Sequence, residues 1–120
     1  MPDRAVPPDD IAPAEFFTRW VPAAVAGDPD RRRRLGDTHA TVQFELTGEG
    51  GGFFTVRIRD GAVEGGEGKA VEPDLAVQVD VATWRALNRG DLSAPEAMLR
   101  RRVQIRGSFL LALKLHLILG

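Results

Sequence analysis

Apolar and polar residues alternate with a period of two in three stretches of the sequence. These stretches are residues 42–46, 54–58 and 75–81, where Val, Leu, Ile or Phe occupies every second position. Such alternation is typical of a β-strand that buries one face. The glycine-rich stretch 48–52 separates the first two and predicts a hairpin between them. The sequence therefore predicts at least three strands, each with one apolar face.

Two weaker stretches extend this strand pattern. The dipeptide Asp60-Gly61 is typical of a tight turn and would begin a further short strand at residues 62–64. Late in the chain, Val103 and Ile105 alternate with polar neighbours before a glycine. This alternation predicts one more short strand.

An aromatic helix is expected before the first strand. Phe16, Phe17 and Trp20 are spaced to lie near one helical face within residues 15–26. Pro22 would bend this helix or start a second one, because proline cannot donate a backbone hydrogen bond. The aromatic face predicts that the segment packs against the rest of the protein.

Three polar residues mark the starts of further helices. Asp80 can cap a helix that begins at Val81 and stops at Gly90. Ser93 is followed three residues later by a glutamate, which is the capping-box pattern. Ser108 can cap a last helix that runs to the end of the sequence. The sequence therefore places two helices before the last strand and one after it.

The order of these elements indicates the fold class. A helix, three or four strands, two helices, a strand and a helix predict an α+β fold with a mostly antiparallel sheet covered on one face. The 120 residues suffice for one hydrophobic core. Residues 1–13 contain four prolines and no apolar run, so we expect a disordered or loosely packed tail there. Residues 14–120 are expected to form a single domain.

The last helix, residues 109–119, is unusually apolar. Nine of its eleven residues are apolar, and the two exceptions, Lys114 and His116, project in nearly opposite directions on a helical wheel. A surface helix of a small domain needs only one apolar face, so a helix without a polar stripe requires cover on a second side. Its own core, another subunit, a bilayer surface or a bound apolar ligand could each supply that cover. Eleven residues are too few to span a membrane.

The chain offers little for catalysis or metal binding. It has no Cys, and its two histidines, His39 and His116, have no metal-ligand spacing. The glycines at 48–52 and the dipeptide Gly68-Lys69 miss the dinucleotide and P-loop patterns, so we interpret both as turns. We find no paired nucleophile and base. The sequence therefore predicts a protein that is not an enzyme and that uses no metal and no cofactor.

Charge is balanced overall but unevenly distributed. The net charge of the chain is −1, yet residues 1–44, 45–80 and 81–120 carry −1, −5 and +5. Near-zero net charge and arginines without interleaved aromatic residues argue against nucleic-acid binding. The arginine runs 31–34 and 100–102 are either solvated or attracted to anionic lipid head groups or coenzyme A phosphates. If the protein loads from an anionic membrane, we expect the basic last third of the chain to approach the membrane first.

Five pieces of the sequence, in this order and spacing, resemble one known family. The resemblance is to the sterol-binding domain of the sterol carrier protein type 2 family, and it extends from about His39 to Leu119. The five pieces are Thr41 to Gly52, Val56 to Gly61, the strand beginning at Asp74, Trp84 to Leu87 with Gly90, and Val103 to Gly107 leading into Leu111 to Leu115.

This resemblance implies a five-stranded sheet whose one face, with helices, encloses an apolar tunnel. Fatty acids, acyl-CoA esters, sterols or phospholipids would bind in the tunnel, and the second side of the last helix would face the lipid. No catalysis is implied. The sequence ends in Ile-Leu-Gly and not in the peroxisomal tripeptide of some members, and its first residues do not resemble a signal peptide. We therefore expect a cytoplasmic protein.

Candidate site residues combine the resemblance with the apolar pattern. Met98 is included because a thioether adapts to varied ligands. The predicted lipid-binding residues are Phe44, Phe54, Val56, Trp84, Met98, Phe109, Leu110, Leu113 and Leu117. Arg100, Arg101 and Arg102 are candidates to meet a lipid head group. The alternative is an interaction module, in which the last helix docks on a second copy of the chain or on a lipid-metabolising enzyme.

Overall fold

The computed structural model describes residues 6–119, without the side chains of Leu117 and Leu119, and contains one five-stranded sheet. The order of its strands across the sheet is β3-β2-β1-β4-β5. Only one neighbouring pair, β1 and β4, is parallel, and the other three pairs are antiparallel. The strands are β1 (Ala40–Thr47), β2 (Gly52–Arg59), β3 (Ala62–Glu67), β4 (Leu75–Asp80) and β5 (Val103–Gly107).

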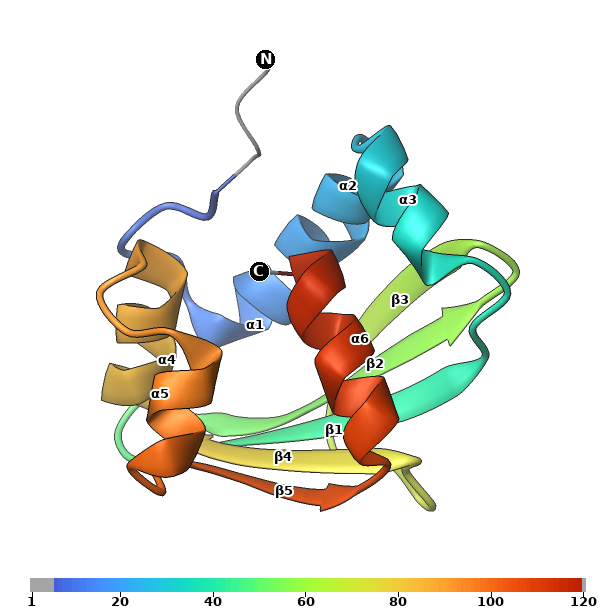
Figure 1. Ribbon diagram of the computed structural model, residues 1–120. Coiled ribbons are helices and arrows are strands. Elements are labelled where there is room, and N and C mark those ends of the chain that lie inside the picture. Colours follow the sequence, from blue (N-terminus) through green and yellow to red (C-terminus); the bar gives the residue numbers. More distant parts are fainter. Residues whose placement is uncertain (1–5, 120) are drawn as a thin grey trace.

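The helices lie on one side of this sheet (Figure 1). The α+β fold with a mostly antiparallel, five-stranded sheet is therefore confirmed. The helices are α1 (Pro13–Glu15), the π-helical segment η1 (Phe16–Trp20), α2 (Val21–Ala26), α3 (Pro29–Leu35), α4 (Val81–Arg89), α5 (Ala94–Leu99) and α6 (Phe109–Leu119).

The three predicted caps start the helices that follow them. The Asp80 carboxylate accepts the backbone N–H of Thr83 at 3.0 Å, so β4 ends at Asp80 and Val81 is helical. The Ser93 hydroxyl accepts the N–H of Glu96 at 3.2 Å, and the Ser108 hydroxyl accepts the N–H of Leu111 at 3.1 Å. Each cap satisfies a donor that the first helical turn leaves unpaired.

The aromatic segment near the N-terminus is one helical run with a π-helical turn. The N–H of Val21 bonds to the carbonyl oxygen of Phe16, five residues back, and Pro22 follows as the second residue of α2. This run crosses β3 so closely that a Cβ added to Gly65 would lie 1.8 Å from the carbonyl oxygen of Phe17. Glycine at this position lets the two backbones touch.

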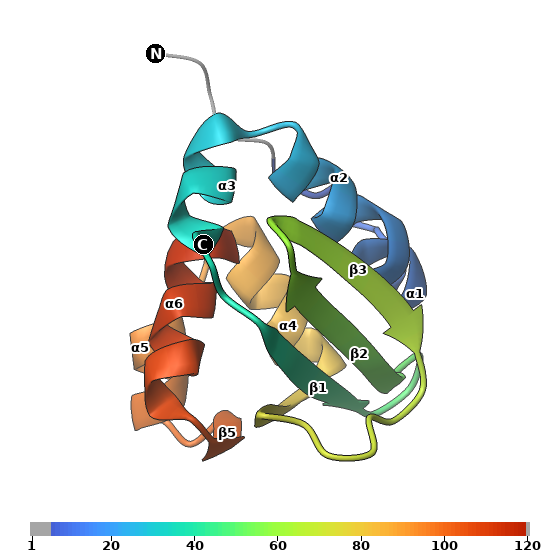
Figure 2. The same cartoon turned by 90° about the vertical axis from the view of Figure 1, so that its right-hand side faces the viewer.

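The helical layer has two ends. Figure 2 shows α2 beside β3 at one end, and α5, α6 and β5 gathered at the other. Before α1, Ile11 is buried, and the Arg85 guanidinium donates hydrogen bonds to the carbonyl oxygens of Asp9 and Ile11 at 3.1 and 3.0 Å. The domain boundary after residue 13 stays a prediction.

Candidate functional site

One half of the inner sheet face is filled by aromatic rings. Phe17 of η1 stacks on Phe54 of β2 with ring centroids 4.9 Å apart and lies 4.8 Å from Phe44 of β1. Phe54 and Val56 are 4% and 2% exposed beneath this layer. We call the region where η1 and α2 cover β2 and β3 the closed half.

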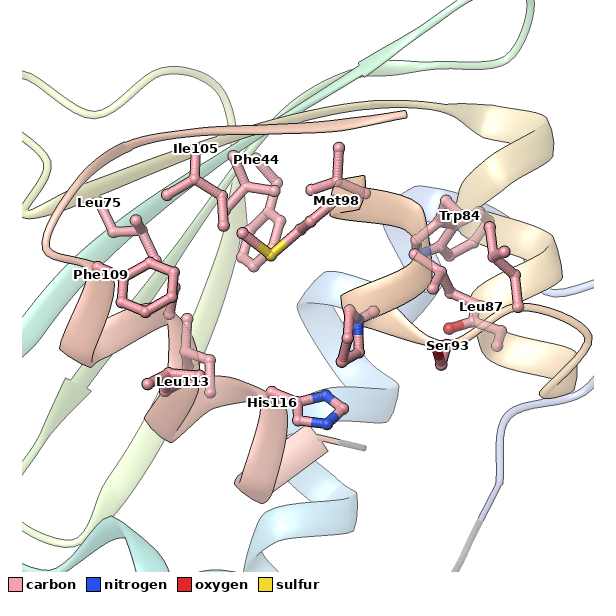
Figure 3. Close-up of a pocket in the computed structure, with 18 of the residues that line it drawn as sticks. Phe44, Leu75, Trp84, Leu87, Ser93, Met98, Ile105, Phe109, Leu113 and His116 are labelled. Carbon is pink, nitrogen blue, oxygen red and sulfur yellow. The ribbon is translucent and has the colours of Figure 1, made fainter. Parts of the chain in front are cut away.

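The other half of the same face is hollow. A cavity of about 330 Å³ lies between the strands β4 and β5 and the helices α4, α5 and α6 (Figure 3). We call this region the open half. The described residues that line the cavity are Phe16, Phe17, Phe44, Leu75, Val77, Trp84, Leu87, Asn88, Leu92, Ser93, Ala94, Pro95, Met98, Val103, Ile105, Phe109, Ala112, Leu113, Leu115 and His116.

The pairing of neighbouring strands places the wall residues of the sheet side by side. Phe44 of β1 is paired with Val77 of β4, and Val77 is paired with Ile105 of β5. Paired residues point to the same face of a sheet, so these three side chains form one row on the cavity wall. Leu75 and Val103 lie two positions away on the same strands and extend the row.

Trp84 closes the aromatic end of the cavity. It is 5% exposed, and its ring meets Phe16 edge-on at 5.2 Å and 83°. Its helix is capped by Asp80, whose carboxylate also accepts the Thr83 hydroxyl at 2.5 Å. That side-chain hydrogen bond is the main cause that holds the pKa of Asp80 below its ordinary value, and the nearby charge of Arg102 acts in the same direction. The ionised cap fixes the start of α4 and, with it, the position of Trp84.

The cavity opens between α5 and α6. Its exposed lining residues lie on these two elements: Ser93 and Pro95 at the start of α5, and Phe109, Leu113 and His116 on α6. Phe109 is 56% and Leu113 46% exposed, so both contribute to the wall and to the rim. These exposures define the mouth of the cavity.

The wall is apolar apart from three polar residues on the helix side of the cavity. Asn88, Ser93 and His116 are the polar members of the described lining. Figure 3 shows Ser93 and His116 on the helix side of the cavity, opposite Leu75 and Ile105 on the sheet. This arrangement suits a molecule with an apolar body and one polar end.

The structure brings five of the nine predicted lipid-binding residues to the cavity wall. These are Phe44, Trp84, Met98, Phe109 and Leu113. Phe54 and Val56 point to the same sheet face but lie beneath the closed half. Leu110 is 79% exposed and off the wall, and the side chain of Leu117 lies outside the described residues. A lipid-binding role for any of these residues stays a prediction.

None of the three candidate head-group arginines is among the described lining residues. Arg100 forms an ion pair with Glu96 at 2.9 Å, and the Arg102 Nε donates to the Thr83 hydroxyl at 3.0 Å. Arg101 is exposed, in the left-handed conformation, with φ of 58°. Arg102 thus ties the start of β5 to the start of α4, whereas Arg101 is exposed to solvent.

The predicted lipid-binding set lacks several residues of the cavity wall, although the pattern of apolar residues in the sequence marked some of them. Leu75, Val77, Val103 and Ile105 occupy the inward positions of the predicted alternation, and Phe16 and Phe17 belong to the predicted aromatic face. Leu87 lies one helical turn after Trp84 in the predicted helix, whereas no periodicity marks residues 88–95, which reach the cavity from the end of α4, the connection to α5 and the start of α5. Their place on the wall depends on tertiary packing alone.

A family model described as the SCP-2 sterol transfer family matches residues 22–120. The chain belongs to this family. The expected resemblance is therefore confirmed, and the protein is a domain of a lipid-carrier family. No curated protein matches the sequence.

Solved structures share the fold. Palmitated SCP2L2 from Aedes aegypti is 20% identical, covers 88% of this chain and 93% of its own, and has a TM-score of 0.70. A possible sterol carrier protein from Thermus thermophilus is 19% identical, with 97% and 88% covered and a TM-score of 0.58. The inverting sec-alkylsulfatase Pisa1 from Pseudomonas sp. is 19% identical, with a TM-score of 0.68. There the match covers 92% of this chain but only 16% of the alkylsulfatase.

Among residues 6–119, no helix is long and apolar enough to cross a bilayer.

Proposed function

We propose that this SCP-2 domain is a non-catalytic lipid carrier that binds one lipid in the cavity of the open half. The observation that carries the proposal is the apolar cavity of about 330 Å³, which remains where the sheet, α5 and α6 fail to fill the space between them. Phe44, Trp84, Met98, Phe109 and Leu113 would contact the ligand. The tunnel expected from the family would then be this cavity, open between α5 and α6.

The size and polarity of the cavity favour a single-chain amphiphile among the expected ligands. Ligand pockets span about 300–1,000 Å³, so this cavity lies at the small end of that range. A fatty acid, or the acyl chain of a coenzyme A ester, suits it better than a two-chained phospholipid or a rigid sterol. The palmitated SCP2L2 relative supports the same choice. The polar end would lie at the mouth, near Ser93 and His116.

Binding would be driven by burial of the hydrocarbon chain. Each buried methylene contributes about 0.8 kcal/mol, so the affinity should rise with chain length until the cavity is full. Few polar groups line the cavity, so we expect low selectivity among single-chain ligands of similar length. Carriage would take place in the cytoplasm, the compartment that the sequence leads us to expect.

Mass spectrometry of lipid that copurifies with the protein tests the proposal. We expect a bound single-chain lipid, and saturable binding of fatty acids by the delipidated protein. Recovery of no lipid, together with no saturable binding of fatty acids, acyl-CoA or fluorescent sterol analogues, would refute it.

The alternative function is a protein interaction module that uses α6. It is favoured by the exposure of Leu110 and by the alkylsulfatase, in which a domain of this fold forms part of an enzyme. A second copy or a lipid-metabolising enzyme would then cover α6. Sedimentation at several concentrations separates the two functions: a tight dimer that binds no lipid, and becomes monomeric and insoluble on Leu113→Glu, would favour the alternative.

A further inference from the structure

The cavity side of α6 is apolar except at its last member. Four of its wall residues stand at positions i, i+3, i+4 and i+7, which share one face of a helix: Phe109, Ala112, Leu113 and His116. His116 lies two turns after Phe109, about 10 Å further along the helix axis. The wall therefore changes from apolar to polar towards the C-terminal end of α6.

The polar side chains of the wall keep hydrogen-bond donors for a ligand. The Ser93 hydroxyl oxygen accepts the N–H of Glu96 at 3.2 Å, and the hydroxyl proton can still be donated. Within residues 6–119, the side chains of Asn88 and His116 form no hydrogen bond. An imidazole ring carries at least one N–H in either protonation state. The polar part of the wall can therefore donate to an acceptor on the ligand.

The surroundings of these donors favour an anionic acceptor. The described lining residues include no Asp, Glu, Lys or Arg, so no carboxylate of the wall would repel an anion. The helices that line this side belong to residues 81–120, which contain seven basic and two acidic residues. Both acids form ion pairs, Asp91 with Arg89 at 3.0 Å and Glu96 with Arg100 at 2.9 Å.

His116 lies where a charged group can stay in contact with water. Its side chain is exposed, as is that of Ser93, whereas Asn88 is half-buried. Figure 3 shows the His116 ring pointing away from α6 towards the side of the cavity on which Ser93 lies. Burial of an ionised carboxylate without a partner is costly. An acid head group should therefore remain beside His116 and Ser93 while its chain fills the apolar part of the cavity.

We propose that His116 recognises the carboxylate of a fatty acid bound in the cavity. Its ring N–H would donate to a carboxylate oxygen, and the Ser93 hydroxyl would be a second donor. The inference rests on the proposed function, because it concerns the polar end of the same ligand. A hydrogen bond to an ionised acceptor is stronger than one to a neutral acceptor. A fatty acid should therefore bind more tightly than the alcohol of the same chain length.

The expected preference for the acid is small. Water reaches both the ring and the head group, and it weakens the interaction between them. We therefore expect palmitate to bind about fivefold more tightly than hexadecanol. This factor agrees with the low selectivity expected of the cavity, because burial of the chain supplies most of the affinity.

Titration of the delipidated protein with palmitate and with hexadecanol tests the role of His116. His116→Leu keeps an apolar side chain on the wall but removes the donor. It should lower the affinity for palmitate about fivefold and leave the affinity for hexadecanol unchanged or raised. His116→Gln keeps an N–H donor, so it should retain part of the preference for the acid.

His39 supplies a matched control. It is the other histidine of the chain, and it is not among the described lining residues. Its side chain is 63% exposed, and its Nε2 lies 3.8 Å from the Asp60 carboxylate. His39→Leu should leave both affinities unchanged. With two histidines, the single variants also assign the ring signals in an NMR spectrum, and palmitate should shift the His116 signals but not those of His39.

The outcomes separate this inference from the proposed function. Equal loss of affinity for palmitate and hexadecanol in His116→Leu would overturn the inference, because His116 would then act only by packing. Saturable palmitate binding that leaves the His116 ring signals unshifted would overturn it as well. Both results would leave the proposed function standing. If the unchanged protein binds neither ligand, the proposed function fails, and this inference fails with it.

Discussion

The two halves of the inner sheet face share one strand pattern but differ in how they are covered. Over β2 and β3, the π-helical turn lies against the sheet and Phe17 stacks on Phe54 at 4.9 Å. Over β4 and β5, the sheet presents Val77, Val103 and Ile105 to a cavity of about 330 Å³. One half thus contributes packing, and the other leaves room for a ligand.

The difference comes from how close the helices approach and how large the facing side chains are. At Gly65, strand β3 has no side chain, so the backbone of η1 rests on it and aromatic rings fill the remaining space. In the open half, α6 faces the cavity with Ala112 between larger residues, and the strands supply Val and Ile. A sheet face with one alternation pattern can therefore be a packed core or a binding site, depending on its cover.

The largest effect is expected from truncating the ring that fills the closed half. Phe17 is 1% exposed and contacts four aromatic rings, so Phe17→Ala should cost about 3–5 kcal/mol of unfolding free energy. The matched change Phe109→Ala, at the exposed mouth, should cost less than about 1 kcal/mol. Urea unfolding measures both, and equal losses would contradict the division into two halves.

The second effect tests the close approach at β3. Gly65→Ala would force a Cβ against the Phe17 backbone and should cost about 1–3 kcal/mol. At Gly66 an added Cβ meets nothing within 4 Å, so Gly66→Ala should be neutral or stabilise by up to about 1 kcal/mol. Thermal unfolding of both variants separates the cost of the clash with the Phe17 backbone from the effect of losing glycine's conformational freedom. Similar midpoints for the two would show that the helix does not rest on Gly65.

The third effect concerns the cap that positions Trp84. Asp80→Ala should cost about 1 kcal/mol at neutral pH, because α4 loses its cap. The pKa of Asp80 is lowered in the folded protein, so its ionisation stabilises the fold above the unfolded pKa of about 3.9. That stabilisation is lost as the pH falls through the lower, folded pKa.

Stability measured against pH checks this assignment. The difference between the unchanged protein and Asp80→Ala should shrink below about pH 4. Asp80→Asn keeps an oxygen that can cap the helix without ionising, so it should retain part of the stability at every pH. If the stability difference between the two proteins grew as the pH fell, the pKa of Asp80 would not be lowered in the folded protein.

The smallest effect on stability, with a large effect on binding, is expected from filling the cavity. Ala112→Leu adds volume to the wall and should change the unfolding free energy by less than about 1 kcal/mol, while fatty-acid affinity falls about tenfold or more. Ala82→Leu adds the same volume at an exposed site on α4 off the wall and should leave the affinity unchanged. Titration of delipidated protein measures both, and equal affinities would place the ligand elsewhere.

Local patterns in the sequence were enough to predict the elements and their inward residues. Alternation marked Val77 and Ile105, and the side chains of Asp80 and Ser93 marked helix starts, because these signals depend on neighbours in the chain. The parallel pairing of β1 with β4 and the π-helical turn were not predicted. The parallel pairing depends on contacts between distant segments, and the π-helical turn is a local departure from regular helix geometry.

The site itself was only half predictable for the same reason. Phe44 and Phe54 are paired neighbours with the same residue type and the same inward direction. Phe54 is buried in the closed half, whereas Phe44 also reaches the cavity. No feature of either residue's own neighbourhood distinguishes them, because the difference lies in the order of the strands: β1 lies next to β4, which lines the cavity, whereas β2 lies next to β3.

Fluorescence quenching by a fatty acid with bromine atoms on its chain tests the central claim most directly. Trp84 lines the cavity, whereas Trp20 is not among the described lining residues and stacks on Phe16 at 5.3 Å. In the delipidated Trp20→Phe variant, the account predicts strong quenching of Trp84 that saturates at one ligand per chain and that requires about tenfold more ligand or more after Ala112→Leu. In Trp84→Phe, quenching of Trp20 should be much weaker. Equal quenching of the two tryptophans, or no saturable quenching of Trp84, would contradict a lipid site in the open half.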